Sequence, residues 1–223
     1  MERVAAVITA AGSGTRMGEP KQFLDLTPGE RLIDRVVATC RARCAWVGVV
    51  LPAGSVWSGA PVDAVIDGGA DRLTSLTAGV AAVPADVDVV VVHSASHPLA
   101  SVDLIDRLTA AVERGADGAV PVLAVVDVVK RRHADDTLST VGREGLGTAQ
   151  APMAWSRPVL DRALVSQAEL GLGDPNRAVE ESAAVEAIGG RVVAVDGELR
   201  NLHVTDPESL AVARALAGPA PLG

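Results

Sequence analysis

Hydrophobic residues occur along this chain in two alternating patterns, which predict alternating strands and helices. Short continuous apolar runs predict buried strands, and the unbroken run Val89–Val92 predicts a central one. Other stretches place their apolar residues on one side of a helix. The predicted strands are Val4–Thr9, Trp46–Leu51, Val62–Ile66, Val87–His93, Gly118–Val126 and Arg191–Val195, and the predicted helices are Arg31–Cys44, Asp71–Val83, Leu104–Arg114, Pro158–Leu170, Val179–Ile188 and Pro207–Leu216. This alternation predicts a multilayer α/β fold with a mostly parallel sheet.

Two segments in the C-terminal half carry local signals of their own. Residues 127–150 are polar, contain Lys130-Arg131-Arg132 and alternate only weakly, so we interpret them as a β-hairpin arm. Thr205 is the expected N-cap of the last helix, with Glu208 at the N3 position of a capping box. We therefore expect one domain over residues 1–223 with an arm at about 127–150.

Composition narrows the class of protein. The 223 residues are 48% hydrophobic but only 2% aromatic, so Val, Ala and Leu must fill the core. A net charge of -8 and a pI near 5.0 argue against general nucleic-acid binding. No apolar run reaches the roughly 18 residues that a membrane span needs. The chain enters a strand at once and shows no signal-peptide pattern, so we expect a cytoplasmic protein.

The two cysteines, Cys40 and Cys44, lie one helical turn apart on a predicted helix. A structural zinc site needs about four ligands, and no nearby residues complete one. We therefore expect buried or half-buried free thiols.

A glycine-rich loop follows the first predicted strand and carries the first candidate chemistry. It runs from Ala10 to Gly18 as Ala-Ala-Gly-Ser-Gly-Thr-Arg-Met-Gly. Its backbone N–H groups can bind a phosphate chain, and Arg16 and Lys21 can neutralise charge on a triphosphate. The residues expected to bind a nucleotide here are Ala10, Ala11, Gly12 and Gly14. The loop lacks the Gly-Lys-Ser/Thr of a Walker A motif, and a tight turn with surface cations is the simpler alternative.

A second glycine-containing turn, Gly68–Ser75, follows a predicted strand and opens a helix. Its glycines allow a ligand to approach the backbone closely, and the Ser75 hydroxyl can hydrogen-bond a base edge. The alternative is a plain helix start, with Asp71 or Thr74 as the N-cap.

A third group, His93–Pro98, ends the strongest predicted strand, where open α/β sheets place their ligand crevice. A nucleotidyltransferase is expected to have a carboxylate here that holds Mg²⁺ against the phosphates, and this stretch has none. Histidines are poor ligands for Mg²⁺, so we interpret His93 as a structural histidine with satisfied hydrogen bonds.

In order and spacing these motifs resemble the 2-C-methyl-D-erythritol 4-phosphate cytidylyltransferase family. The family's Ala-Ala-Gly-x-Gly-x-Arg-Met and Pro-Lys-Gln match Ala10–Met17 and Pro20–Gln22, and its Gly-Gly-x-x-Arg-x-x-Ser matches Gly68–Ser75. Matches with more differences are Pro121–Lys130, Gln150–Met153 and Val179–Glu186. The resemblance covers nearly the whole chain.

The resemblance implies a three-layer, Rossmann-like nucleotidyltransferase fold that moves CMP from CTP to 2-C-methyl-D-erythritol 4-phosphate or a related polyol phosphate. Pyrophosphate would leave, with Arg16 and Lys21 stabilising the transition state. The cytosine pocket would be lined by Ala10, Ala11, Gly69, Ala70 and Ser75. The resemblance also implies Mg²⁺ and a homodimer whose arms reach across to the partner, with Arg143 positioning the acceptor.

Several positions depart from the family's pattern on the acceptor and metal side. Ser94 stands at the position of the metal-binding aspartate, and His97 stands at that of an arginine. Val128 replaces a threonine of the arm, and His203 replaces a substrate-binding lysine. The acidic residues that could compensate for Ser94 are Asp127, Glu180, Glu181 and Asp206.

Two other interpretations remain open at this point. The nucleotide loop is kept while the acceptor pocket is altered, and the same pattern is expected of a paralogue that binds nucleotide without turnover and has a regulatory role. An NAD-binding Rossmann protein is the weaker alternative, because the third glycine is missing and Leu51-Pro52 stands where an acidic residue would end the second strand.

Overall fold

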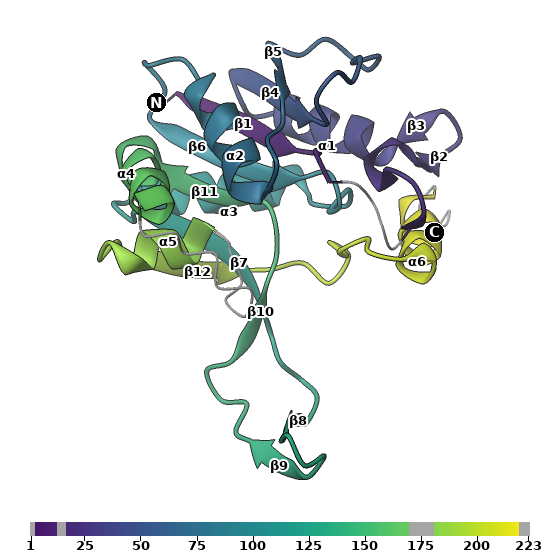
Figure 1. Cartoon of the computed structure of the whole chain (residues 1–223), viewed down its shortest axis with the longest axis vertical. Coiled ribbons are helices and arrows are strands. Elements are labelled where there is room, and N and C mark those ends of the chain that lie inside the picture. Colours follow the sequence, from purple (N-terminus) through teal and green to yellow (C-terminus); the bar gives the residue numbers. More distant parts are fainter. Residues whose placement is uncertain (1–2, 13–16, 170–180, 219–223) are drawn as a thin grey trace.

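The computed structural model describes residues 3–12, 17–169 and 181–218. Its central feature is one eight-stranded sheet (Figure 1). Its strands are β1 (Val4–Thr9), β4 (Trp46–Leu51), β5 (Ala64–Asp67), β6 (Val89–Ser94), β7 (Gly118–Ala124), β10 (Gly147–Ala149), β11 (Met153–Ser156) and β12 (Val192–Asp196). The pairs β6–β1, β1–β4, β4–β5 and β12–β7 are parallel, whereas β11 runs antiparallel to both β6 and β7. The expected mostly parallel sheet is thereby confirmed.

Helices cover both faces of the sheet because successive side chains of a strand point to opposite faces. Ala6 and Ile8 of β1 pack in one core with α1 (Leu32–Arg41) and α3 (Val102–Glu113). Ala5 and Val7 pack in the other core, and the helices on that side are α2 (Arg72–Ala81), α4 (Arg157–Glu169) and α5 (Glu181–Ala187). The predicted three-layer α/β architecture is therefore correct.

Some elements differ from the sequence-based prediction. The short central strand β11 and the two-stranded sheet of β2 (Asp25–Thr27) and β3 (Glu30–Arg31) were not expected. The last helix, α6 (Pro207–Ala217), has Asp206 as its N-cap rather than Thr205, and Ser209 rather than Glu208 completes the capping box. Asp206 accepts a hydrogen bond from the Ser209 backbone N–H at 2.8 Å.

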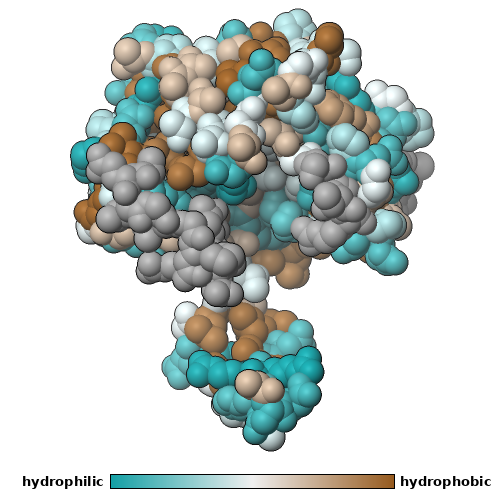
Figure 2. Space-filling view, in the orientation of Figure 1, coloured by the Kyte–Doolittle hydropathy of each residue, from teal (hydrophilic) through white to brown (hydrophobic). Residues whose placement is uncertain are grey.

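The segment expected to form a hairpin arm does form one. Strands β8 (Val129–Arg132) and β9 (Leu138–Val141) pair antiparallel, and the arm extends away from the body of the molecule (Figure 1). Hydrophobic surface is visible on the arm in Figure 2, where Val126, Val128 and Leu138 are 76%, 67% and 63% exposed. Exposed apolar surface of this kind is typical of a contact region.

Cys40 on α1 and Cys44 just after this helix are buried free thiols, as expected. Burial raises the pKa of Cys40 above its usual value and the pKa of Cys44 to about 12, which makes both unreactive. Within the described ranges, no helix has the length and apolar character that a membrane crossing requires.

Candidate active site

A cavity of about 460 Å³ opens at the carboxyl ends of β1 and β6. Ligand sites of open α/β sheets form at this edge because the loops that leave neighbouring parallel strands meet there. Three such segments line the cavity, Ala10–Gly12 after β1, Gly69–Ser75 at the start of α2 and Ser94–Ser96 after β6. Lys21, Gln22 and His203 line the cavity from other parts of the chain, and Thr9 lines it at the end of β1. We call this space the first cavity.

The first two of these segments touch each other, and glycine makes the contact possible. A Cβ atom on Gly68 would lie 2.5 Å from the Cβ of Ala11, and one on Gly69 would lie 2.3 Å from Oγ1 of Thr74. Both distances are far shorter than a normal contact. A larger residue at position 68 would therefore push the two segments apart, and one at position 69 would distort the turn before α2. The two motifs that the sequence singled out therefore form one continuous wall.

Asp71 and Ser75 hold this wall in place. Asp71 is the N-cap of α2 and accepts a hydrogen bond from the Thr74 backbone N–H at 2.8 Å, which confirms one of the two expected caps. The hydrogen bonds from Thr74 keep the pKa of Asp71 below its usual value. The Ser75 hydroxyl donates to the Asp71 carbonyl at 2.7 Å and accepts from the Gly69 N–H at 3.0 Å. Ser75 lines the cavity as expected, but its hydroxyl proton serves the loop rather than a base.

Lys21 enters the cavity from a short 3₁₀ helix, Lys21–Phe23. Its Nζ atom donates to the carbonyl oxygen of Val204 at 2.9 Å. Gln22 beside it is 3% exposed and donates through Nε2 to the Gly12 carbonyl at 3.2 Å. The sequence singled out Lys21 but gave Gln22 no role, although Gln22 stands in the same Pro-Lys-Gln motif. Gly14 and Arg16 lie outside the described residues.

A second cavity of about 540 Å³ adjoins the first. The two share Arg72, Ser94 and His203 as lining residues. The second cavity continues from there toward the base of the arm, where Thr148 and Gln150 line it. Figure 2 shows a recess with hydrophilic surface between the body and the arm. The site therefore has two connected compartments.

Two histidines meet where the compartments join. The rings of His97 and His203 stack with their centroids 4.5 Å apart and their planes 16° from parallel. Burial lowers the pKa of His97 to about 2, and the charges of His203, His93, Lys21 and Arg72 act in the same direction. The His97 imidazole is therefore neutral at neutral pH, and its Nδ1 has no hydrogen-bond partner among the described residues.

His93 was expected to be a structural histidine with satisfied hydrogen bonds, and only half of this is correct. The residue is 1% exposed, but within the described part of the chain neither of its ring nitrogens has a hydrogen-bond partner. Burial lowers its pKa to about 3, which keeps the ring uncharged. A neutral ring costs less to leave unpaired than a charged one, which explains why it is tolerated in the core.

Three of the four carboxylates that could replace the family's metal ligand lie in the described part of the chain, and none of these three lines either cavity. Glu181 is nearly buried and accepts from Arg72 Nη2 at 2.7 Å, Asp206 caps α6, and Asp127 is exposed on the arm. Glu180 lies outside the described residues. Among the residues that the structure describes, no group of three or more acidic, histidine or cysteine residues could hold a metal ion. Mg²⁺ prefers carboxylate oxygens, and at the end of β6, where the family has an aspartate, this chain offers only the hydroxyl of Ser94.

The three residues expected to position the acceptor are not brought together within one chain. His203 lines both cavities. Arg143 and Val128 lie on the exposed arm, where Arg143 donates through Nη1 to the Val126 carbonyl, and neither lines a cavity described above. The acceptor side of the site is therefore incomplete within a single chain if those two residues take part.

Comparison with known proteins identifies the family. Residues 4–218 match the model of 2-C-methyl-D-erythritol 4-phosphate cytidylyltransferase. Proteins of that name from Rubrobacter xylanophilus and Chromobacterium violaceum are 33% and 37% identical to this chain, over 97% and 95% of it and 95% and 96% of their own lengths. The crystal structure of the enzyme from Thermus thermophilus superposes with a TM-score of 0.82 at 31% identity, covering 97% of this chain and 98% of that one. The chain belongs to the 2-C-methyl-D-erythritol 4-phosphate cytidylyltransferase family of nucleotidyltransferases.

Proposed function

We propose that this protein transfers CMP from CTP to 2-C-methyl-D-erythritol 4-phosphate and releases pyrophosphate. One observation carries the proposal: Lys21 and the two glycine-containing loops line one cavity at the carboxyl edge of the sheet. The family's relatives carry the name of this reaction, and the chain matches them over nearly its whole length.

The first cavity is the proposed nucleotide site. Its wall of Ala10–Gly12 and Gly69–Ser75 presents backbone groups and small side chains, on which a flat base can lie without displacing a bulky residue. Lys21 supplies a positive charge held by the Val204 carbonyl. By resemblance, Gly14 would bind the nucleotide and Arg16 would stabilise the charge on its phosphates.

The proposed reaction is an attack at phosphorus. A phosphate oxygen of the acceptor forms a bond to the α-phosphorus of CTP, and the bond from that phosphorus to the oxygen bridging to the β-phosphate breaks. Negative charge that grows on the triphosphate during this step is stabilised by Lys21 and Arg16. A positioned cation in a partly enclosed site is worth more than one in water, because less solvent screens it.

The second cavity is the proposed acceptor site, with His203 at its junction with the nucleotide. We propose that a second copy of the chain completes it by bringing Arg143 and Val128 on its arm, in a homodimer. The exposed Val126, Val128 and Leu138 of the arm support this contact, since apolar side chains gain stability when a partner covers them. Residues 127–150 would then be the dimerisation arm of a single domain.

The resemblance implies Mg²⁺, but the described side chains offer it no carboxylate at the expected place. Ser94 is half-buried at the end of β6, and its hydroxyl accepts from the Ser96 N–H at 3.3 Å. A hydroxyl carries no charge and binds Mg²⁺ more weakly than a carboxylate does. We propose that the metal requirement of this chain differs from that of a family member with aspartate at this position.

A paralogue without turnover finds no support in the comparisons, since the relatives and the structure described above carry the enzyme's name. We propose that the protein acts in the cytosol, and its two buried free thiols are compatible with a reducing compartment.

The direct test is a pyrophosphate-release assay with purified protein, CTP, Mg²⁺ and 2-C-methyl-D-erythritol 4-phosphate. We expect release that depends on the acceptor, with one pyrophosphate formed for each molecule of acceptor that becomes linked to CMP through its phosphate. ATP in place of CTP, and ribitol or glycerol phosphate as acceptor, serve as controls. CTP binding without pyrophosphate release with any of these acceptors would refute the proposed transfer.

A further inference from the structure

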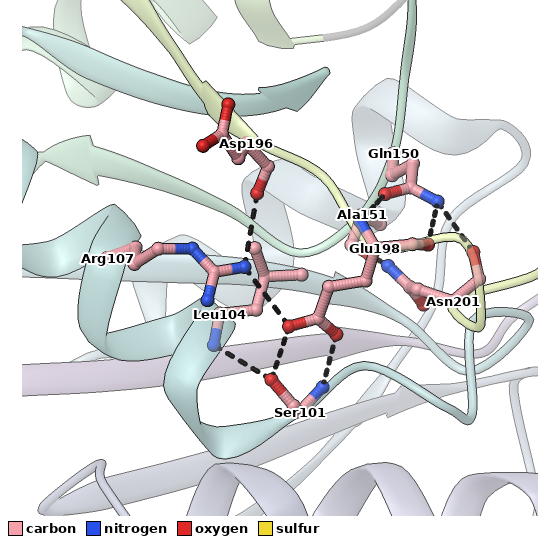
Figure 3. A network of polar contacts seen from close by, with 8 residues as sticks. All are labelled: Ser101, Leu104, Arg107, Gln150, Ala151, Asp196, Glu198 and Asn201. Atoms are coloured by element: carbon pink, nitrogen blue, oxygen red, sulfur yellow. Dashed lines mark hydrogen bonds and ion pairs between the residues drawn. The ribbon is translucent and has the colours of Figure 1, made fainter. Parts of the chain in front are cut away.

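Gln150 connects the base of the arm to the segment that carries His203. It follows β10 directly, on the chain returning from the arm, and is 7% exposed. Its Nε2 atom donates to the carbonyl oxygens of Glu198 and Asn201 at 2.9 and 2.8 Å, and its Oε1 atom accepts from the Glu198 N–H at 2.9 Å. Figure 3 shows the Gln150 side chain pointing into the turn formed by Glu198 and Asn201.

These contacts use nearly all of the hydrogen-bonding capacity of the Gln150 amide. A glutamine has two amide protons and two oxygen lone pairs, and both protons and one lone pair are engaged here. The fit is also tight, because a Cβ atom on Gly197 would lie 2.6 Å from Gln150 Oε1. Gln150 lines the second cavity, but a side chain so engaged has little left to offer a substrate. Its contribution to the site is therefore the position of the backbone at Glu198 and Asn201, to which it is hydrogen-bonded.

The segment that Gln150 holds, residues 197–205, ends at the candidate active site. The Val204 N–H donates to the Ser96 carbonyl at 2.8 Å, and the Val204 carbonyl accepts from Lys21 Nζ at 2.9 Å. His203, the residue before it, stacks on His97 and lines both cavities. The position of this segment therefore sets where Lys21 and His203 lie.

Glu198 anchors the same segment on its other side. Its carboxylate accepts from the Ser101 N–H and from Arg107 Nη2, each at 3.1 Å, and from the Ser101 hydroxyl (Figure 3). Ser101 is the N-cap of α3, where a negative charge is stabilised by the helix dipole. The segment is thus fixed to α3 through the Glu198 carboxylate, and to Gln150 at the base of the arm through backbone groups of Glu198 and Asn201.

We propose that Gln150 is a positioning residue that holds the 197–205 segment in place, and with it Lys21 and His203, so that the arm and the active site are mechanically connected. The inference rests on the proposed function. It predicts that a substitution of Gln150 lowers the rate of transfer and raises the KM of the acceptor. CTP binding is affected much less, because the nucleotide wall is held by Asp71, Ser75 and Gln22 instead.

The test is Gln150→Glu, which keeps the size of the side chain but places a carboxylate opposite two carbonyl oxygens. We expect kcat to fall about 10- to 100-fold, as a displacement near 1 Å would produce. The KM of the acceptor should rise about tenfold, and the Kd of CTP should stay within about threefold. Gln167→Glu is the matched control, since Gln167 in α4 is also 7% exposed and lies outside both cavities. It should leave all three constants unchanged.

Hydrogen exchange of the 198–204 amides gives a readout that needs no turnover, and Gln150→Met provides a second variant if Gln150→Glu does not fold. Faster exchange at Glu198, Asn201 and Val204 in a Gln150 variant, without a change across the nucleotide wall, supports the inference. The inference is overturned if the wild-type protein turns over and the Gln150 variants have the same kcat, acceptor KM and amide exchange as Gln167→Glu. Absence of turnover in the wild-type protein would instead refute the proposed function, while exchange still tests the connection.

Discussion

The two cavities meet at Ser94 and His203 but are built differently. The first is formed by local turns, in which Gly68 packs against Ala11 and Asp71 caps the following helix. The second is formed by side chains and by the 197–205 segment, which long-range hydrogen bonds hold in place. Arg143 and Val128, which were expected to act on the acceptor from the arm, do lie on the arm and line neither cavity of their own chain.

This difference shows how one chain can keep its nucleotide and change its acceptor. Backbone groups in tight turns recognise features that every nucleoside triphosphate shares, and a side-chain substitution elsewhere does not disturb them. The second cavity depends on particular side chains, so replacing a cation by His97 or His203 changes it directly. We therefore expect loss of the cation in the first cavity to impair transfer to any acceptor, and changes at the second cavity to alter which acceptor is used and how well.

Removing Lys21 is expected to have the largest effect. Lys21→Met takes away a positioned cation, so kcat should fall about 100- to 1,000-fold while CTP still binds to the nucleotide wall. Steady-state kinetics and calorimetric titration with CTP measure the two quantities. Arg43→Met, which removes a surface cation paired with Asp106, serves as the control and should leave kcat unchanged. A kcat for Lys21→Met within threefold of wild type would exclude the proposed role.

The buried histidines make stability depend on pH. Because the folded pKa values of His93 and His97 are about 3 and about 2, the unfolded state takes up protons below pH 6.5 that the folded state does not. Stability should therefore fall with falling pH, by about 2 kcal/mol per histidine between pH 7 and pH 5.

Urea unfolding of the wild type and of His93→Leu at both pH values measures this effect. The leucine cannot be protonated, so about 2 kcal/mol of the pH dependence should disappear. His133→Gln on the arm is the control, because His133 is exposed and hydrogen-bonded to Ser139. Equal pH dependence in wild type and His93→Leu would show that His93 is not buried in the neutral form.

Adding a carboxylate at the junction tests the metal side. Ser94→Asp should lower the Mg²⁺ concentration needed for half-maximal activity about tenfold, because a carboxylate binds Mg²⁺ better than a hydroxyl does. Ser94→Asn introduces a side chain of the same size as aspartate but without its charge, so it should show no such gain. If the Mg²⁺ requirement of Ser94→Asp equals that of wild type, the missing carboxylate does not determine the metal requirement.

Loss of the α2 cap is expected to give the smallest effect. Asp71→Ala should lower the free energy of unfolding by about 1 kcal/mol and weaken CTP binding a few-fold, since the cap also shapes the nucleotide wall. Asp206→Ala removes the equivalent cap of α6, and Asp206 lines neither cavity. It should cost similar stability and leave CTP binding intact. Equal CTP affinities in the two variants would contradict a role of the Asp71 turn in the site.

Patterns local in the sequence predicted the sheet well, and the two glycine-containing motifs that they singled out line one cavity. The apolar runs of β1 and β6 identified its central strands, and Gly68 and Gly69 marked a turn that needs a close backbone approach. Asp206 could also have been predicted as the N-cap of α6, because the proline that follows it, Pro207, is typical of the first position of a helix.

Contacts between distant residues could not be predicted in the same way. Nothing around Gln150 indicates that its amide binds residues 48 and 51 positions later, and nothing in the sequence shows that His97 stacks on His203. Strand β11 was missed because its four residues, Met153–Ser156, are too few to show a clear alternation and its two neighbours supply the pairing. The acceptor side depends mostly on such contacts.

The central claim, that one chain completes its nucleotide side but needs a partner's arm for its acceptor side, is tested most directly by mixing two inactive variants. In a mixed dimer of Lys21→Met and Arg143→Ala, one of the two sites combines an intact Lys21 with an intact Arg143 from the other arm. Random exchange of subunits should then restore about a quarter of the wild-type rate of pyrophosphate release. A mixture no more active than its two components, despite confirmed subunit exchange, would contradict the claim.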